Sequence, residues 1–226
     1  MSPSYQDSLA ISHSFKEKNI PPFVSYYRRS LPRFLQVKKW IDSKSIGEVR
    51  HIRWHLSKPT TEQDLSGNYY WRTDSKITTA EYFDDLASHG LDLIVFLLGN
   101  IKEVSGMSLN QQGLYSAKDA VSATWLHDSG ITGSGSCNFG LYMREDTVEI
   151  YGSKGKITFS IFDSEPLLLT NDKGETKLII EHPENIQLYH VQQMHASLTS
   201  GSIHPSNGNT ATHTSWIMDK IVGTTL

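Results

Sequence analysis

Cysteine is almost absent from this chain, because Cys137 is the only one in 226 residues. A single thiol forms no intramolecular disulfide, which excludes a disulfide-stapled scaffold and favours a reducing compartment. The sequence also has no apolar run of the about 18 residues that a membrane-spanning helix needs. Residues 1–20 lack the basic start and the apolar stretch of a signal peptide. We therefore expect a cytoplasmic protein with no membrane partner.

Positive charge is not in excess either. Lys and Arg number 21 against 24 Asp and Glu, a formal net charge of -3, which gives no general attraction to nucleic acid. The apolar fraction of 38% and the charged fraction of 20% are ordinary for a globular protein. The length allows a sizeable core in one large domain or two small ones.

Several motifs that carry known chemistries are missing. Residues Gly133-Ser134-Gly135 are not followed by the third glycine and the helix of a dinucleotide-binding turn, and Gly152-Ser153-Lys154-Gly155 lacks the first glycine of a P-loop. We interpret the first as part of a strand and the second as a turn. No Gly-x-Ser-x-Gly elbow supports nucleophilic hydrolysis, and no HExxH or CxxC pattern supports a metal site.

Hydrophobic periodicity predicts the order of helices and strands. Helices are expected over residues 5–18, 186–199 and 208–222, and a further helix is expected to begin after a cap at Ser30. Another helix is expected to carry Asp85 and His89 and to run to about residue 98. In the helix over 186–199, the residues expected to face inward are Leu188, Val191, Met194 and Leu198. Strands are expected at residues 23–27, 49–56, 102–110, 120–127, 131–139, 146–151, 156–162, 166–170 and 176–181. The long aromatic loop over residues 57–79 is typical of a functional segment.

This order predicts an α+β fold with one open, large and mainly antiparallel β-sheet that carries helices on one face. Residues 1–226 are expected to form a single domain. Alternating strands such as 121–125 and 157–161 are expected to leave apolar rows on the open face. A homo-oligomer that forms through the sheet is therefore predicted.

The segment 82–92 holds the most informative pattern of the chain. At about 100° per residue, Asp85, His89 and Asp92 fall on one face of a helix, while apolar residues cover its other sides. Packing gives no reason to gather these three groups. An imidazole held by a carboxylate one turn away suits proton transfer near neutral pH, because the carboxylate orients the ring.

Two other interpretations of this pattern remain open. An Asp four residues before a His on an exposed helix is a common surface pair that contributes only about 0.2–0.5 kcal/mol. Such a pair can also share a metal ion, although no HExxH or CxxC pattern supplies further ligands.

Several segments, in order, resemble the C-terminal domain of the glucose-fructose oxidoreductase, inositol dehydrogenase and rhizopine-catabolism family (Gfo/Idh/MocA). They are Phe23 to Phe34, Ser45-Ile46-Gly47-Glu48-Val49, Trp71-Arg72, Asp85-x-x-x-His89-x-x-Asp92, Asp119-Ala120-Val121-Ser122, Val148 to Gly155 and Asn209 to Val222. Together they cover nearly the whole chain, and their order and spacing are specific.

The resemblance implies an oxidoreductase with an N-terminal Rossmann domain that binds NAD or NADP, and a second domain that completes a sugar or polyol pocket and builds the oligomer. His89 would then take the proton of a substrate hydroxyl as hydride leaves the same carbon, and Asp85 would assist it. The residues implied to bind substrate are Trp71, Arg72, Tyr26, Arg28 and Asp92.

Two departures from the family pattern stand out. The chain begins where the family's Glu-Lys-Pro motif should just have ended, so we expect the family's catalytic Lys and the Rossmann domain to be missing and no cofactor to bind this chain alone. The Gly-rich stretch usual before the Asp is Thr79-Ala80-Glu81 here, and these side chains would reshape the backbone near substrate. The alternative from another functional class is a non-catalytic carbohydrate-binding or assembly module.

Overall fold

The computed structural model describes residues 2, 4–68, 70–80 and 82–223. Its centre is an eight-stranded open sheet with the order β2-β3-β4-β1-β5-β6-β7-β8. All neighbouring strands are antiparallel except β1 and β4, which are parallel. The strands are β1 (Val49–Ser57), β2 (Ile101–Leu109), β3 (Ala120–His127), β4 (Thr132–Asn138), β5 (Glu145–Gly152), β6 (Gly155–Phe159), β7 (Leu167–Asn171) and β8 (Gly174–Leu178).

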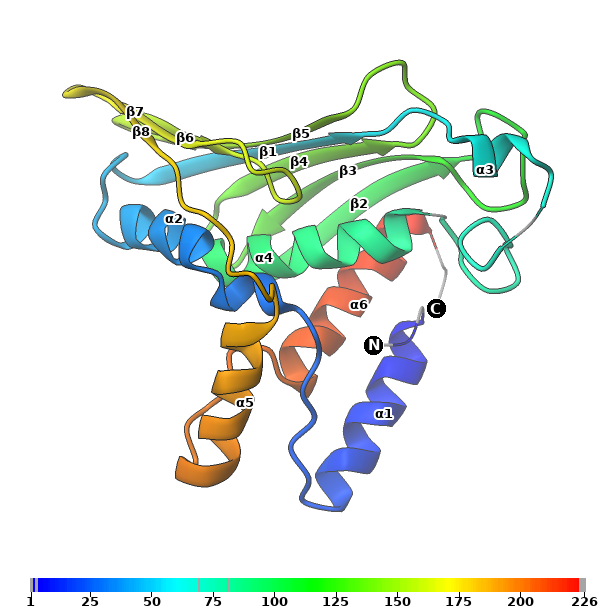
Figure 1. The fold of residues 1–226 in the computed structure, drawn as a ribbon, viewed down its shortest axis with the longest axis horizontal. Coiled ribbons are helices and arrows are strands. Elements are labelled where there is room, and N and C mark those ends of the chain that lie inside the picture. The colour runs from blue at the N-terminus through cyan, green and yellow to red at the C-terminus, as the bar shows by residue number, and fades with distance from the viewer. Residues whose placement is uncertain (1, 3, 69, 81, 224–226) are drawn as a thin grey trace.

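The main helices lie on one side of this sheet (Figure 1). They are α1 (Tyr5–Glu17), α2 (Pro32–Asp42), α4 (Ser88–Leu98), α5 (Leu188–Ser200) and α6 (Gly208–Val222). The described residues also form three short helices: the 3-10 helix Tyr27–Ser30, α3 (Glu62–Leu65) and the π-helix Phe83–Ala87. The predicted α+β class, the mainly antiparallel open sheet and the helices on one face are confirmed.

The core lies between the sheet and the helices α2, α4 and α6 (Figure 1). Gly90 in α4 permits the closest approach, because a Cβ atom at this position would come within 2.2 Å of the Trp54 ring of β1. Gly106 of β2 has the same role beneath α6, since its Cβ would meet the carbonyl oxygen of Ile221 at 2.5 Å. Both helices therefore pack directly onto the backbone or rings of the sheet.

On β1, β3 and β6, most side chains of the opposite face of the sheet are polar. Val121 and Trp125 of β3 and Ile157 of β6 are buried in the core, whereas Ser122 and Thr124 between them are exposed. On β1, His51 and His55 bond to Thr132 and Ser136 of β4. The expected apolar rows on the open face are therefore wrong for these strands, because alternation turns Val121, Trp125 and Ile157 toward the helices. Association through the sheet stays a prediction.

Two local expectations are corrected at the start of the chain. Residues 23–27 form no strand but one isolated bridge between Phe23 and Asn207 and then the 3-10 helix. Ser30 does not cap α2, whose N-cap is Leu31; its hydroxyl donates to Gln193 of α5 instead. Because proline is already fixed in the helical φ range, Pro32 can start α2 without a side-chain cap.

The predicted inward face of α5 is also wrong. Leu188, Val191 and Leu198 are 42%, 55% and 64% exposed, while the residue that α5 buries is His190. Amphipathic spacing identifies residues that share a face of a helix, but it does not say which neighbouring element that face meets. Among the described residues, no helix is both long and apolar enough to cross a membrane.

Candidate functional site

A cleft of about 570 Å³ lies on the helix side of the molecule. Its walls come from α1, the segment before the 3-10 helix, the aromatic loop, the π-helix, the start of α4 and α6. The described residues that line it are Ser2, Ile11, Phe23, Val24, Ser25, Tyr26, Trp71, Ile77, Thr78, Asp84, Asp85, Ser88, His89, Ser215 and Met218. Four of the seven site residues predicted from the sequence are among them: Tyr26, Trp71, Asp85 and His89.

The π-helix Phe83–Ala87 carries the two carboxylates that line this cleft, those of Asp84 and Asp85. A π-helix bonds residue i to i+5 and is wider than an α-helix, and single turns of this kind are frequent at functional sites. The assumption of about 100° per residue therefore fails between Asp85 and His89. Both carboxylates of the pair Asp84-Asp85 line the same cleft as His89.

Asp85 is held by Arg72 rather than by His89. The Arg72 guanidinium donates to Asp85 Oδ2 from Nε at 3.0 Å and from Nη2 at 2.6 Å. The same guanidinium lies over the ring of Trp71, with its central carbon 4.1 Å from the ring centroid. The predicted direct contact between carboxylate and imidazole is thus replaced by a Trp71-Arg72-Asp85 cluster. Trp71 lines the cleft and is 46% exposed.

His89 sits between two aromatic rings. Tyr26 meets it edge-on at 5.4 Å between ring centroids, and Tyr27 lies tilted at 5.5 Å. Its Nδ1 is buried and has no hydrogen-bond partner in the described part of the chain. When the proton is on Nδ1, Nε2 is the free acceptor. Burial, and then the charge of Arg28, lower the pKa of His89 to about 4, against a raising effect of Asp85, so the imidazole is neutral at physiological pH.

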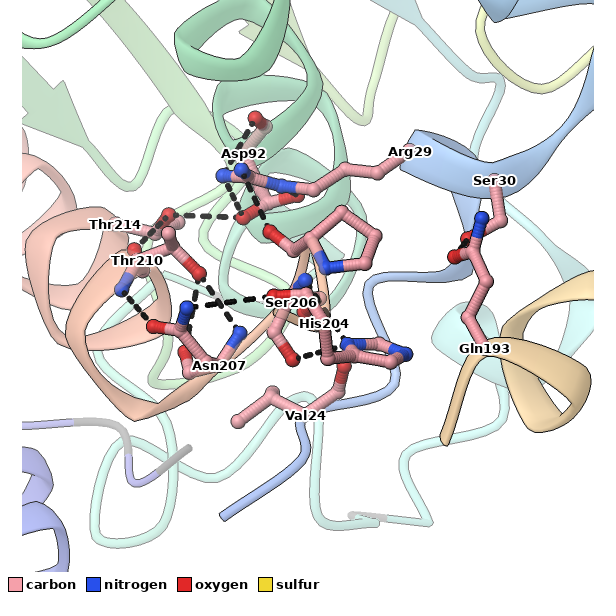
Figure 2. Close-up of polar contacts among 11 residues, drawn as sticks. Val24, Arg29, Ser30, Asp92, Gln193, His204, Ser206, Asn207, Thr210 and Thr214 are labelled. Carbon is pink, nitrogen blue, oxygen red and sulfur yellow. Dashed lines mark hydrogen bonds and ion pairs between the residues drawn. The ribbon is translucent and has the colours of Figure 1, made fainter. Parts of the chain in front are cut away.

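Asp92 is not part of the cleft. Its side chain is fully buried, and Arg29 donates to both of its carboxylate oxygens at 2.7 Å (Figure 2). Thr214 of α6 also donates to Asp92, and Arg29 reaches the carbonyl of Pro205. The expectation that Asp92 binds substrate does not fit this position. The α-helical part of the segment turns Asp92 into the core, where it joins α4 to the 3-10 helix and α6.

Arg28 is also outside the cleft lining. It is 7% exposed, donates from Nε to the carbonyl of Ile161, and lies over the ring of Phe162 at 4.5 Å. Its effect on the cleft is electrostatic, through His89. Tyr26, in contrast, lines the cleft, and burial raises the pKa of its hydroxyl, so this hydroxyl stays protonated.

The sequence interpretation missed Asp84. Its Oδ2 accepts hydrogen bonds from the hydroxyl of Thr78 and from the backbone N–H groups of Thr79 at 2.8 Å and Ala80 at 3.2 Å. Thr79 and Ala80 belong to the stretch that replaces the family's glycines, and Glu81 lies outside the described residues. The adjacent acidic pair was visible in the sequence, but helical spacing selected only Asp85.

No nucleotide cradle is found in the described residues. Gly133 and Gly135 lie inside β4, and a Cβ at Gly133 would meet the Trp125 ring at 2.1 Å. These glycines thus serve ring packing and do not form the turn that receives a pyrophosphate at a helix N-terminus. Residues 133–135 therefore do not fit the pyrophosphate of a dinucleotide. In the same described residues, no three His, Cys, Asp or Glu side chains gather closely enough to hold a metal ion.

The family model for the GFO/IDH/MocA C-terminal domain matches residues 34–158, more than half of the chain. The chain belongs to the GFO/IDH/MocA family. The resemblance seen in the sequence is confirmed. Oxidoreductase P35 of Formosa agariphila is 29% identical over 211 residues, which cover 92% of this chain and 64% of that protein. The GFO/IDH/MocA chain described here therefore spans less than two thirds of this relative.

A levoglucosan dehydrogenase of Pseudarthrobacter phenanthrenivorans is 26% identical over 131 residues, 58% of this chain and 30% of that protein. Among solved structures, levoglucosan dehydrogenase with NADH and levoglucosan has a TM-score of 0.83 at 21% identity, over 97% of this chain and 68% of that chain. An oxidoreductase from Agrobacterium radiobacter with NAD+, L-tartaric acid and magnesium has a TM-score of 0.80 at 20% identity, over 96% and 66%. These likenesses show the fold.

Proposed function

We propose that residues 1–226 form the substrate-binding and oligomerisation domain of an NAD(P)-dependent oxidoreductase that acts on a sugar or polyol. The observation that carries the proposal is the cleft in which Tyr26, Trp71, Asp85 and a neutral His89 come together. Named relatives that act on or hold sugars, levoglucosan and L-sorbose among them, support this substrate class. A cytoplasmic location stays a prediction.

The chain's own residues would handle the substrate and its proton. His89 would accept the proton of the reacting hydroxyl at Nε2, because this nitrogen is unprotonated in the neutral ring with Nδ1–H. Trp71 would pack against the C–H face of the sugar, and the Arg72–Asp85 pair would donate to and accept from its hydroxyls. Nicotinamide, when bound, would supply the acceptor for the hydride.

Substrate binding by the cleft can be measured without turnover. We expect the 226-residue chain to bind levoglucosan or L-sorbose saturably in calorimetric titrations, and Trp71→Ala to weaken binding about tenfold, in the range of a lost aromatic contact. Tyr142→Ala is the matched control, because Tyr142 is 94% exposed and is not among the lining residues. Equal losses in both variants, or no binding of any sugar by the unchanged chain, would remove the sugar site.

Cofactor binding should require more protein than this chain. We expect titration of the 226-residue chain with NADH and with NADPH, followed by fluorescence, to show no saturation at micromolar concentrations, since its described residues form no Gly-rich strand-to-helix turn. Saturable micromolar binding of either dinucleotide would contradict the proposal that this chain binds the substrate but not the cofactor.

A further inference from the structure

Asp84 is the carboxylate of the cleft whose charge no cation balances in the described residues. Its Oδ2 accepts three hydrogen bonds, from Thr78, Thr79 and Ala80. Oδ1 makes none of these bonds, and the half-buried Asp84 side chain lines the cleft. Three donors on one oxygen hold the anionic carboxylate in a fixed orientation. The other oxygen is left for a group that enters the cleft.

The charged residues among the described lining of the cleft are acidic, namely Asp84 and Asp85. None of its described lining residues is Lys or Arg. The charge of Asp85 is neutralised by Arg72 at 2.6 Å, and His89 is uncharged because burial lowers its pKa to about 4. Behind the wall, Asp219 accepts from the N–H of Tyr5, and its pKa is raised by burial and further by Asp84. Arg28 also acts on His89, but its guanidinium packs against Ile161 and Phe162 and does not line the cleft. A ligand that reaches Asp84 therefore meets a carboxylate with no Lys or Arg among the described lining residues.

We infer that Asp84 is a specificity-determining residue that restricts the cleft to uncharged sugars and polyols and rejects sugar acids. The inference rests on the proposed function, which it deepens by naming the charge class of the substrate. A hydroxyl donates to Oδ1 of Asp84 at no electrostatic cost, whereas a ligand carboxylate can only repel it. Rejection by a fixed like charge is a common way to build selectivity between ligands of similar shape.

The fold alone does not decide this property. Solved structures of similar fold hold uncharged ligands, levoglucosan and L-sorbose, in one protein and L-tartaric acid in another. We therefore assign charge selection in this chain to a side chain of the cleft and not to the fold. In this chain, Asp84 occupies the cleft wall where its carboxylate also ties down the backbone of Thr79 and Ala80.

The test compares two sugars with the same ring that differ in one charged group. Calorimetric titrations of the 226-residue chain with D-glucose and with D-glucuronate at pH 7 and low salt give a ratio of dissociation constants. We expect glucose to bind about tenfold or more tightly than glucuronate. Because mobile ions screen repulsion between partly exposed charges, raising the salt concentration to about 0.5 M should narrow the ratio. This comparison needs no variant.

Asp84→Asn is the decisive variant, since an amide keeps the shape and the acceptor oxygen for Thr79 and Ala80 but removes the charge. In this variant, glucuronate should bind more tightly than it does to the unchanged chain, so that the dissociation constants of glucose and glucuronate differ by no more than about threefold. Asp74→Asn is the matched control: Asp74 accepts from the N–H of Lys76 in the same loop and does not line the cleft, so the ratio should stay as in the unchanged chain.

The outcomes separate the two proposals. If glucose and glucuronate bind the unchanged chain equally, or if Asp84→Asn leaves a large ratio intact, selection by Asp84 is overturned while the sugar site stands. If neither these sugars nor levoglucosan binds, the sugar site fails, and selection fails with it. A ratio that narrows equally in Asp74→Asn would also overturn the inference, because it would trace the effect to the loop and not to the charge in the cleft.

Discussion

Replacing His89 with asparagine should lower kcat by about 10²–10⁴-fold in a protein that joins this chain to a cofactor-binding domain. This is the usual share of general acid–base catalysis. Asparagine keeps roughly the size of the imidazole and some of its hydrogen bonding, but it cannot take up the proton of the reacting hydroxyl. The measurement is steady-state reduction of NAD or NADP with the sugar that the protein turns over fastest.

The pH dependence gives the same experiment a second readout. Burial lowers the pKa of His89 to about 4, and a general base must be unprotonated. The kcat/KM of the unchanged protein should therefore stay level down to about pH 5 and fall as pH drops through about 4, and this limb should disappear in His89→Asn. His13→Asn is the control, because His13 is exposed on α1 and outside the cleft. Near-normal turnover of His89→Asn would contradict the assignment.

The pH dependence of kcat/KM should also be measured for Asp85→Asn. Asp85 favours the protonated imidazole, so its loss should move the acid limb to lower pH. Because Asp85 also holds Arg72, turnover should fall as well.

Replacing Asp92 with alanine should have the largest effect on folding. The free energy of unfolding should fall by about 3–5 kcal/mol, because the change leaves the Arg29 guanidinium buried without its counter-charge. Arg29 and Asp92 are 5% and 0% exposed, and Arg29 donates to both carboxylate oxygens (Figure 2). Urea denaturation at neutral pH, followed by circular dichroism, measures the change.

Asp42→Ala is the matched control for this change. Asp42 pairs with Lys38 one turn away on α2, and both side chains are accessible to solvent, so its loss should cost no more than about 0.5 kcal/mol. An Asp92→Ala chain that unfolds like the unchanged chain but no longer binds sugar would show that Asp92 reaches the cleft, as the sequence pattern suggested.

Much of the fold could be predicted because strand alternation and helix periodicity are local properties. The alternation of Val121, Ala123 and Trp125 predicted β3, and Gly99-Asn100 predicted the C-terminal end of α4. Gly99 adopts a φ of +89°, a conformation that glycine enters without strain, so the end of this helix was also visible in the sequence.

The candidate site could be predicted only in part. Residue types and spacing pointed to Asp85 and His89, and both line the cleft. The partner of each charged group was not visible, because partners come from distant parts of the chain. Arg29 lies 63 residues before Asp92, and Arg72 lies 13 residues before Asp85. Nor did spacing indicate the π-helix, whose wider turn brings Asp84 into the cleft.

The sequence by itself determined most of the helices and strands, the mainly antiparallel sheet, and the family of the chain, since these follow from local periodicity and from motifs in a fixed order. Only the tertiary structure decided which face of α5 meets the protein, that Asp92 lies in the core with Arg29, and that Asp84 faces the cleft. The physical reason is that burial and charge pairing depend on which elements pack together, and a pattern within one element carries no information about its neighbours.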